Sequence, residues 1–291
     1  MMAKKILITG GSGFIGSHLV DLLLKQKYKI TVLDLVKPKK KNIIFIKGTA
    51  LNYQLIKKIT KNVDYVFHLS GVSDINKVKK IPALTIENNI LSSTYLLDAC
   101  RVNSVKRIFF ASSIYAHGDS GNLYTTSKIA TEKIIENYNL LFGLKYTILR
   151  YATAYGENNR GVDVVSIFTK KALTNSNIYI HGNGKQTRDF IHAKDIAAGS
   201  VKSIDKKYEN KVLTVGTNRR TSISKLANII LNITNSGSKI FIRKNAKRFD
   251  DFDLDKIKKI KNNKFLKLKT FMRLEDGIKY YLVKQIKKRK K

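Results

Sequence analysis

The sequence predicts an α/β protein built on a doubly wound parallel sheet, with a smaller C-terminal part. Three observations support this prediction. Short apolar segments alternate with helical patterns over about the first 150 residues, a glycine-rich turn follows the first segment, and an acidic residue ends the second. Such alternation is typical of a parallel sheet that is covered by helices on both faces.

The predicted strands are short runs rich in aliphatic and aromatic residues, as buried parallel strands are. They are Ile6–Thr9, Ile30–Leu33, Ile43–Ile46, Tyr65–Leu69, Arg107–Ala111 and Tyr146–Leu149. Helical periodicity marks Ser92–Arg101 and Ser127–Leu141 between them. No low-complexity linker marks a domain boundary, so the strand and helix pattern alone defines the organisation of the chain.

The glycine-rich turn lies in the segment ILITGGSGFIGSHLVDLLLK, residues 6–25. The spacing of Gly10, Gly13 and Gly16 allows a sharp strand-to-helix turn and leaves the first helical N–H groups uncovered. These donors and the positive end of the helix dipole suit the pyrophosphate of a dinucleotide. A glycine-rich turn that binds no ligand is the alternative interpretation.

Asp34 stands at the end of the second predicted strand. A carboxylate at this place in a βαβ unit accepts hydrogen bonds from the adenosine ribose and repels the additional phosphate of NADP. The sequence therefore favours NAD as the cofactor. An ordinary turn residue is the alternative, and four nearby lysines could accommodate a phosphate: Lys37, Lys39, Lys40 and Lys41.

Composition limits the class of protein. The chain has 291 residues, of which 43% are hydrophobic, so it can bury a substantial core. No apolar stretch is long enough to cross a bilayer, and the start, MMAKKILITGG, shows no cleavage site, so a cytoplasmic protein is expected. The single cysteine, Cys100, is expected to be a buried packing residue, and the five scattered histidines predict no metal site.

The charge is unusual, because 56 Lys and Arg against 21 Asp and Glu give a formal net charge of +35. Such an excess suggests a polyanionic partner such as nucleic acid. However, the lysines are spread along the whole chain rather than gathered into a stripe with aromatic residues, so nucleic-acid binding is not expected. The basic tail KQIKKRKK is interpreted as a frayed, solvated terminus.

A second group of candidate residues follows the fifth predicted strand, in FFASSIYAHGDSGNLYTTSK. Tyr124 and Lys128 are four residues apart, so they share one face of the following helix. An ammonium close to a phenol favours the phenolate, which makes Tyr124 a candidate general base. Ser113, at the carboxyl end of the strand, could bind the same substrate hydroxyl. Two neighbours on a solvated helix face are the alternative.

Taken together, these features resemble those of the extended short-chain dehydrogenase/reductases, in particular the NAD-dependent epimerase/dehydratase group that acts on nucleotide sugars. The resemblance covers nearly the whole chain. The motifs that carry it, beside Asp34, are TGGSGFIGSHL at 9–19, VFHLSG at 66–71, NNILSSTYLLDA at 88–99, ASSIYAHG at 111–118, YTTSK at 124–128, LRYATAYG at 149–156, GNGKQTRDFIHAKDIA at 182–197 and LTVGTNRRTSISKLA at 213–227.

The resemblance implies roles for individual residues. Tyr124 would take a proton from a sugar hydroxyl, Lys128 would also hold the nicotinamide ribose, and Ser113 would steady the reacting oxygen. Arg188 would bind the diphosphate of the sugar nucleotide, for which its planar fork is suited; a surface ion pair within TRDF is the alternative. The implied cofactor-binding residues are Gly10, Gly13, Phe14, Ile15, Gly16, Asp34, Leu69, Ser70, Asn89, Tyr124 and Lys128, and Thr153 joins Ser113 and Arg188 in binding the substrate.

The resemblance also implies an organisation into two domains and a dimer. Residues 1–156 and about 186–219 would form the NAD-binding Rossmann domain, and about 157–185 and 220–291 the substrate-binding domain. Members of the family commonly form homodimers through two long helices. No metal is implied.

Departures from the family pattern refine the expected reaction. Dehydratases of the family carry Asp and Glu directly after the catalytic Ser or Thr, and here these positions are Ile114 and Tyr115. Neither can move a proton at C5 or C6 of the sugar, so 4-epimerisation through a transient 4-keto sugar is favoured. A reductase of a nucleotide-linked keto-sugar and an RNA-binding protein remain alternatives. Further departures are Thr49, Thr153, His117 and the short segment between Ser113 and Tyr124, which leave the sugar and the nucleotide undetermined.

Overall fold

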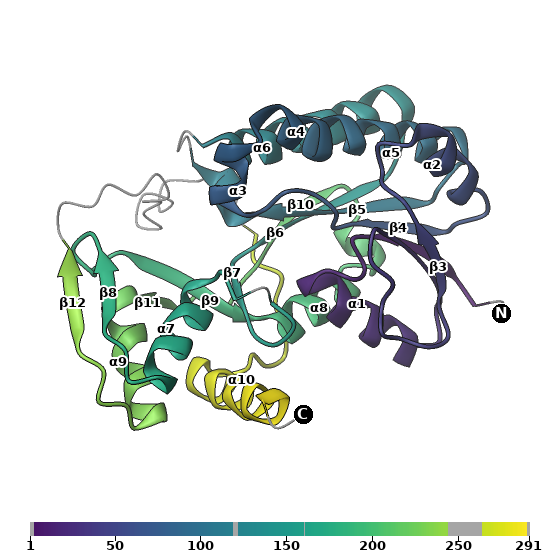
Figure 1. Ribbon diagram of the computed structural model, residues 1–291. Helices are drawn as coiled ribbons and strands as arrows, with labels where there is room; N and C mark the ends of the chain where they lie inside the picture. The colour runs from purple at the N-terminus through teal and green to yellow at the C-terminus, as the bar shows by residue number, and fades with distance from the viewer. Residues whose placement is uncertain (1–2, 119–121, 160, 244–263, 290–291) are drawn as a thin grey trace.

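The computed structural model describes residues 3–118, 122–159, 161–243 and 264–289. Its centre is a seven-stranded parallel sheet with the strand order β10-β6-β5-β4-β1-β2-β3 (Figure 1). The strands are β1 (Lys5–Thr9), β2 (Lys29–Asp34), β3 (Ile44–Lys47), β4 (Tyr65–His68), β5 (Arg107–Ser113), β6 (Tyr146–Tyr151) and β10 (Lys211–Val215). The predicted fold class is confirmed, and each end of the six predicted strands lies within two residues of the observed end.

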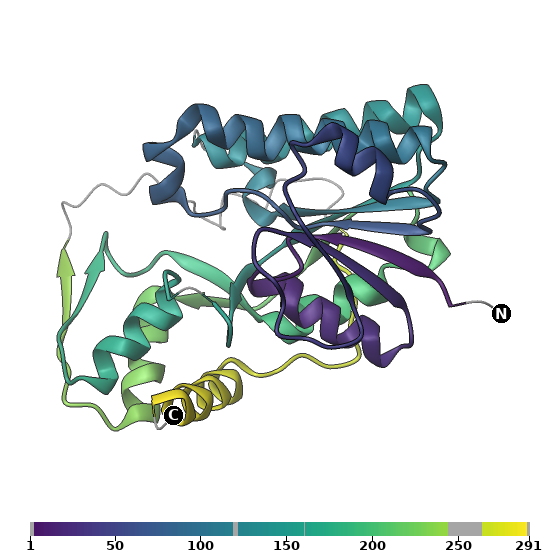
Figure 2. The ribbon, with the colours of Figure 1, turned by 45° about the vertical axis from the view of Figure 1, so that its right-hand side comes forward.

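Helices cover both faces of this sheet (Figures 1 and 2). On one face lie α1 (Phe14–Lys25) and α8 (Ala193–Lys202), and on the other α2 (Tyr53–Ile59), α5 (Ser92–Val102) and α6 (Leu123–Phe142). Ile6 and Ile8 of β1 pack toward α1, whereas Leu7 between them packs toward α5. Because successive side chains of a strand point to opposite faces, an all-apolar strand is required where both faces are covered.

The predicted helix at 92–101 is α5, and the one at 127–141 is the longer α6. Helix α6 begins four residues earlier than predicted because Asn122 caps it, with its side-chain oxygen accepting from the amide of Thr125 at 2.8 Å. Gly143 ends α6 in the left-handed conformation, with φ of 70°. As a result, Tyr124 and Lys128 both lie within the first two turns of α6.

A smaller set of elements lies beside the main sheet, at the lower left of Figure 1. It contains a three-stranded sheet, β11-β9-β7, and a two-stranded one, β12-β8. Its elements are β7 (Thr153–Tyr155), α7 (Val164–Leu173), β8 (Ile178–His181), β9 (Thr187–His192), β11 (Arg220–Ser222), α9 (Ile223–Thr234), β12 (Ile240–Arg243) and α10 (Leu274–Arg289). Strand β9 pairs with β7 and β11, while β10 pairs with β6 of the main sheet. The boundaries of the two domains given above stay a prediction.

The remaining short elements lie around the predicted site. Helices α3 (Ile75–Lys80) and α4 (Pro82–Ile86) lead into a π-helical turn, η1 (Glu87–Leu91), which continues as α5. A 3₁₀ turn, η2 (Ile114–His117), follows β5, and η3 (Lys206–Tyr208) precedes β10. Turns of the π type are frequent at functional sites, and η1 contains the predicted cofactor residue Asn89.

Other expectations from composition can be compared with the described residues. Cys100 is a buried free cysteine, as predicted, and burial raises the pKa of its thiol. Within the described ranges, no helix is long and apolar enough to cross a membrane, and no cluster of His, Cys, Asp and Glu could hold a metal. The basic tail, expected to be frayed, is helical as far as Arg289, and its last two residues lie outside the described ranges.

His68 links three elements inside the core. One ring nitrogen lies 2.7 Å from the hydroxyl of Thr9 on β1, and the other lies 2.8 Å from the hydroxyl of Ser93 on α5. Burial, with a contribution from the charge of Lys128, lowers the pKa of His68 to about 3. The histidine is therefore neutral in the folded protein. In acidic solution the unfolded chain binds a proton at His68, whereas the folded protein does not.

We expect His68 to make the protein acid-labile. Between pH 6.5 and about 3 the unfolded chain binds a proton at this residue that the folded chain does not, so stability falls as pH falls. The expected slope from this residue is about 1.4 kcal/mol per pH unit. Urea unfolding of the wild type and His68→Gln between pH 4.5 and 7 measures it; equal slopes in the two proteins would contradict the assignment.

Candidate functional site

The glycine turn after β1 packs directly against the end of β4. Gly10 has φ of +75°, and a Cβ atom there would lie 2.7 Å from the amide nitrogen of Ser70. A Cβ atom on Gly16 would lie 2.1 Å from the carbonyl oxygen of Gly10. Only glycine fits at these two positions, because any side chain would separate the turn from α1 and from the loop after β4.

The first turn of α1 presents backbone N–H groups without partners among the described residues. Gly13 begins the helix without a side-chain cap, and the first intrahelical bond runs from the amide of Ser17 to the carbonyl of Gly13 at 3.0 Å. The amides of Phe14, Ile15 and Gly16 precede that bond, and the first turn contains no acidic residue. These residues fit the pyrophosphate of a dinucleotide, since helix N-termini bind anions in this way.

Asp34 ends β2 next to this turn. One carboxylate oxygen accepts from the amide of Ser12 at 3.0 Å, and the other from the amide of Val36 at 3.2 Å. The amide of Gly10 also donates to the carbonyl of Leu33 at 3.0 Å, which fixes the turn to the end of β2. The structure therefore brings Asp34 and the glycines together, where a carboxylate can meet a ribose bound beside the turn.

The loop after β4 lies against the glycine turn. The amide of Leu69 donates to the carbonyl of Thr9 at 3.0 Å, and the hydroxyl of Ser70 donates to the hydroxyl of Thr9 at 3.0 Å. The chain leaves β1 toward one face of the sheet and β4 toward the other, so the two loops diverge at the carboxyl edge, where ligands of doubly wound sheets bind. Leu69 and Ser70 thus lie where a cofactor contact is predicted.

The predicted cofactor residue Asn89 is fully engaged with protein groups. Its amide nitrogen donates to the carbonyl of Val72 at 3.0 Å and to the hydroxyl of Ser127 at 2.9 Å, while its oxygen accepts from the amide of Val72 at 2.7 Å. The side chain is 3% exposed. These bonds tie the loop after β4 to α6 beside the predicted catalytic residues, and a contact of Asn89 with the cofactor stays a prediction.

The three predicted catalytic residues meet at the carboxyl end of β5. Ser113 is the last residue of β5, and its side chain lies beside the hydroxyl of Tyr124, on whose pKa it acts. The Ser113 oxygen also accepts from the amide of Tyr115 at 3.3 Å. Lys128 lies one turn further along α6 and donates to the carbonyl of Ala111 at 2.8 Å. All three candidates are buried, so the alternative of a solvated helix face does not hold.

The pKa of Tyr124 differs from the prediction. Burial raises the pKa of this phenol to about 12, although the side chain of Ser113 acts to lower it. The ammonium of Lys128 lies 5.9 Å from the centre of the Tyr124 ring and 4.6 Å from that of Phe110. The spacing of Tyr124 and Lys128 in the sequence indicates only the attraction between the two groups, whereas in the folded protein the desolvation of the phenolate dominates.

Lys128 is itself strongly perturbed. Burial lowers the pKa of its amine to about 8, although the charge of Glu132 acts to raise it. An ammonium with three donors uses one on Ala111, so donors remain for a ligand that binds at this edge of the sheet. Shifted pKa values at two adjacent buried groups are typical of a catalytic site.

The predicted substrate residues lie on neighbouring strands of the smaller sheet. Thr153 begins β7, and its register partner on β9, Phe190, comes two residues after Arg188. Arg188 is 8% exposed and donates to the carbonyl of Thr187 at 2.9 Å. Asp189 is also buried and accepts from the amide of Asn218 at 2.9 Å, so a surface ion pair does not explain TRDF.

A polar cluster beside the predicted catalytic residues was not predicted from the sequence; Ser112 and Glu132 in it are buried, and Arg150 and His117 are half-buried. It contains Ser112, Glu132, Arg150 and His117, which come from β5, α6, β6 and η2. Glu132 follows Lys128 by four residues, the spacing of neighbours on one helix face. That spacing could have identified Glu132, whereas its partners come from distant parts of the sequence and are found only through the fold.

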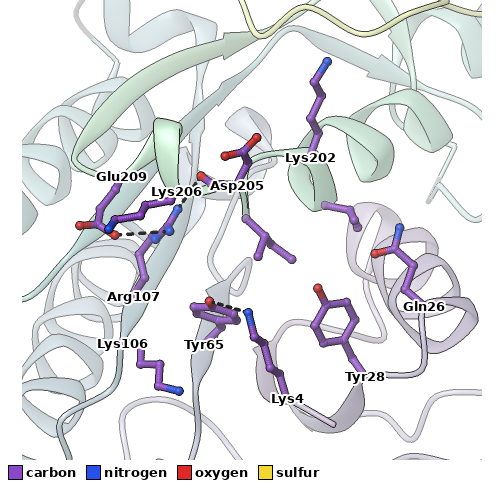
Figure 3. Close-up of a pocket in the computed structure, with 12 residues that line it drawn as sticks. Lys4, Gln26, Tyr28, Tyr65, Lys106, Arg107, Lys202, Asp205, Lys206 and Glu209 are labelled. Atoms are coloured by element: carbon purple, nitrogen blue, oxygen red, sulfur yellow. Dashed lines mark hydrogen bonds and ion pairs between the residues drawn. The ribbon is translucent and has the colours of Figure 1, made fainter. Parts of the chain in front are cut away.

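A cavity of about 740 Å³ lies at the opposite, amino edge of the sheet (Figure 3). It is lined by Lys4, Tyr65 and Arg107 at the starts of β1, β4 and β5, and by the segment after α8. Lys4 donates to the hydroxyl of Tyr65 at 3.2 Å, and Arg107 to the carbonyl of Ser203 at 3.2 Å. Because ligands of doubly wound sheets bind at the carboxyl edge, this cavity is not the predicted site.

Residues 6–216 match the family model for the NAD dependent epimerase/dehydratase family. The chain is 34% identical over 248 residues to a protein of Methanocaldococcus jannaschii provisionally named a UDP-glucose 4-epimerase, covering 77% of this chain and 81% of that protein. It is 32% identical over 267 residues to a UDP-N-acetyl-alpha-D-glucosaminuronate decarboxylase of Bacillus cytotoxicus, covering 82% and 83%.

Solved structures agree with this result. The UDP-glucose 4-epimerase of Thermotoga maritima, solved with UDP-glucose, has a TM-score of 0.86 at 27% identity and covers 99% of this chain and 100% of its own. The UDP-glucuronic acid 4-epimerase of Bacillus cereus, solved with UDP-glucuronic acid and NAD, has a TM-score of 0.83 at 25% identity and covers 97% and 99%. The family is NAD-dependent, which confirms the predicted cofactor at the level of the family. The chain therefore belongs to the NAD-dependent epimerase/dehydratase family of enzymes.

Proposed function

We propose that the protein is an NAD-dependent 4-epimerase of a nucleotide sugar, with a UDP-sugar as substrate. The observation that carries the proposal is the buried contact between Ser113 and Tyr124 beside Lys128, at the same edge of the sheet as the glycine turn. The relatives and solved structures, several of which are named as UDP-sugar 4-epimerases, support this substrate class.

Each residue has a distinct part in the proposed reaction. Tyr124 takes the proton of the sugar hydroxyl at C4 and later returns it, while Ser113 holds the same oxygen through a hydrogen bond. Lys128 supplies positive charge and a donor beside them. Bound NAD supplies reversible hydride acceptance, so the sugar changes configuration without net oxidation. Because burial raises the pKa of Tyr124 to about 12, a charged Lys128 is needed to favour proton transfer.

The residues after Ser113 argue against dehydration and decarboxylation. Ile114 is 5% exposed and Tyr115 follows it in η2, so no carboxylate occupies either position. A proton transfer at C5 or C6 of the sugar would need such a group. A decarboxylase is among the relatives, and a reductase of a keto-sugar would use the same three residues, so assay of the products separates these reactions.

The smaller set of elements is proposed to bind the nucleotide part of the substrate. Arg188 on β9 and Thr153 on β7 lie on adjacent strands, and the guanidinium of Arg188 suits the oxygens of a diphosphate.

We also propose that the protein is located in the cytoplasm. This location is supported by the free thiol of Cys100, since free cysteines are typical of reducing compartments.

We also propose a homodimer that pairs through the helical layer of α4, α5 and α6. This layer, together with η1 between α4 and α5, exposes large apolar side chains at Leu84, Leu91, Leu140 and Leu141, which are 45%, 39%, 80% and 68% exposed. Exposed apolar groups of this kind mark association surfaces in proteins that are otherwise polar outside.

The Tyr124→Phe variant is expected to lose at least about a hundredfold in kcat, because it lacks the group that accepts the proton. Tyr138→Phe, on the same helix but half-buried away from Ser113, is the matched control and should keep its activity. Interconversion of UDP-glucose and UDP-galactose, and of their N-acetyl relatives, is measured without added cofactor. Stoichiometric turnover of NADH would indicate a reductase, and a small loss in Tyr124→Phe would exclude Tyr124 as the base.

The Asp34→Ala variant should lose preference for NAD over NADP. Removing the carboxylate removes both its bonds to the ribose and its repulsion of a 2′-phosphate, so the ratio of the two dissociation constants should fall about tenfold or more. Asp205→Ala, which removes a carboxylate paired with Lys207 at 3.1 Å after α8, at the amino edge of the sheet, is the control. Titration calorimetry gives both constants; an unchanged ratio would show that Asp34 does not face the ribose.

The homodimer predicts a mass in solution of twice the 33.0 kDa of one chain. Light scattering after size-exclusion chromatography measures it. The double variant Leu140→Glu and Leu141→Glu should shift the population to the monomer, whereas Ile44→Glu, on the edge strand β3 and 64% exposed, should not. A wild-type monomer at micromolar concentration would refute the dimer without affecting the proposed reaction.

A further inference from the structure

The polar cluster beside the predicted catalytic residues is centred on a carboxylate. Glu132 is 3% exposed and lies one helical turn after Lys128 on α6. Its two oxygens receive the Nε and Nη2 groups of Arg150 at 3.0 and 2.5 Å, and one of them also accepts from the hydroxyl of Ser112. This two-pronged geometry is the strong form of an ion pair and fixes the direction of the carboxylate.

Arg150 is held in turn by a neutral histidine. Its Nη1 group donates to Nδ1 of His117 at 2.8 Å. A guanidinium has no acceptor, so Nδ1 must accept and the ring proton must sit on Nε2, which lies 3.1 Å from the hydroxyl of Thr214 on β10. Burial and the charge of Arg150 lower the pKa of His117 to about 4, in agreement with a neutral ring.

The cluster therefore joins four elements that surround the proposed catalytic residues. Ser112 is next to Ser113 on β5, His117 ends the turn that begins after Ser113, and Glu132 is on the helix of Tyr124 and Lys128. Arg150 on β6 connects them. This paired polar network is a rigid support, since a displacement of the half-buried Arg150 would leave the buried carboxylate of Glu132 without its ion pair.

The ammonium of Lys128 needs a counter-charge from this cluster. It faces the carbonyl of Ala111, the rings of Phe110 and Tyr124, and on β4 the neutral His68, none of which carries a negative charge in the resting protein. Without a carboxylate, burial would favour the neutral amine. Glu132 is the carboxylate on the same helix face, and its charge acts on Lys128 in the direction that keeps the proton.

We propose that Glu132, clamped by Arg150 and Ser112, is the positioning residue that keeps the amine of Lys128 protonated inside the site. The residue touches neither substrate nor cofactor and acts only through Lys128. The importance of this charge for catalysis rests on the proposed function. The protonation state of Lys128 itself can be measured without any reaction.

The test follows the ¹⁵N resonance of the Lys128 side chain with pH, in protein labelled at lysine and with the signal assigned by its loss in Lys128→Met. The wild-type midpoint is expected at about 8. In Glu132→Gln the midpoint should fall by about one pH unit or more, because an attractive charge is lost. Glu136→Gln removes a half-exposed carboxylate of the same helix that pairs with Lys133 at 2.8 Å, and should leave the midpoint unchanged.

The Glu132→Gln variant could be destabilised by the unpaired Arg150, so a second variant is included. Glu132→Asp keeps a charge for Arg150 but withdraws it from Lys128, and its midpoint should lie between those of the wild type and Glu132→Gln. A midpoint equal to the wild-type value in whichever of the two variants folds would overturn the proposal.

Activity then separates this inference from the proposed function. If both are correct, the alkaline limb of kcat/KM for epimerisation moves to lower pH in Glu132→Gln together with the Lys128 midpoint. A shifted midpoint in a protein that does not epimerise would support the role of Glu132 and refute the reaction. Epimerisation with an unmoved midpoint would refute only the role of Glu132.

Discussion

The contact between Gly10 and the loop after β4 is the constraint on which the rest of the site depends. With no room for a Cβ atom, the glycine turn lies against Ser70 and the first turn of α1 lies against Gly10. This close packing sets the amide groups of α1 at the carboxyl edge between β1 and β4. The same edge of the sheet receives Ser113 from β5, so the residues proposed for cofactor binding and for catalysis lie along one edge.

The ionisable side chains at the carboxyl edge of the sheet, Tyr124, Lys128 and Glu132, are buried. Burial alone would leave both Tyr124 and Lys128 neutral, because it raises the pKa of the phenol and lowers that of the amine. The charge of Glu132 opposes the effect of burial on Lys128, because it raises the pKa of the amine. Since Glu132 is paired with Arg150, the two residues together add no net charge to the site. In such a site small displacements have large electrostatic effects, which explains why so many hydrogen bonds hold α6 in place.

The fold was largely predictable because its signals are local. Apolar runs such as Ile6–Thr9, the spacing of Gly10, Gly13 and Gly16, and Asp34 at a strand end each require only a few neighbouring residues. One missed feature, the start of α6, is also local, because the cap at Asn122 directly precedes the helix. The other missed features depend on distant segments, since burial by the fold sets the pKa of Tyr124 and Arg150 on β6 holds Glu132 of α6.

The central claim is that the hydroxyl of Tyr124 contacts the oxygen at C4 of the sugar while the nicotinamide of NAD faces the carbon C4 itself. A crystal structure of the complex with NAD and a UDP-sugar measures this directly. The account predicts the pyrophosphate at the amides of Phe14 and Ile15, and the Tyr124 hydroxyl about 2.6 to 3.2 Å from the sugar oxygen at C4. A Tyr124 hydroxyl separated from the nicotinamide by more than the width of a sugar ring would contradict it.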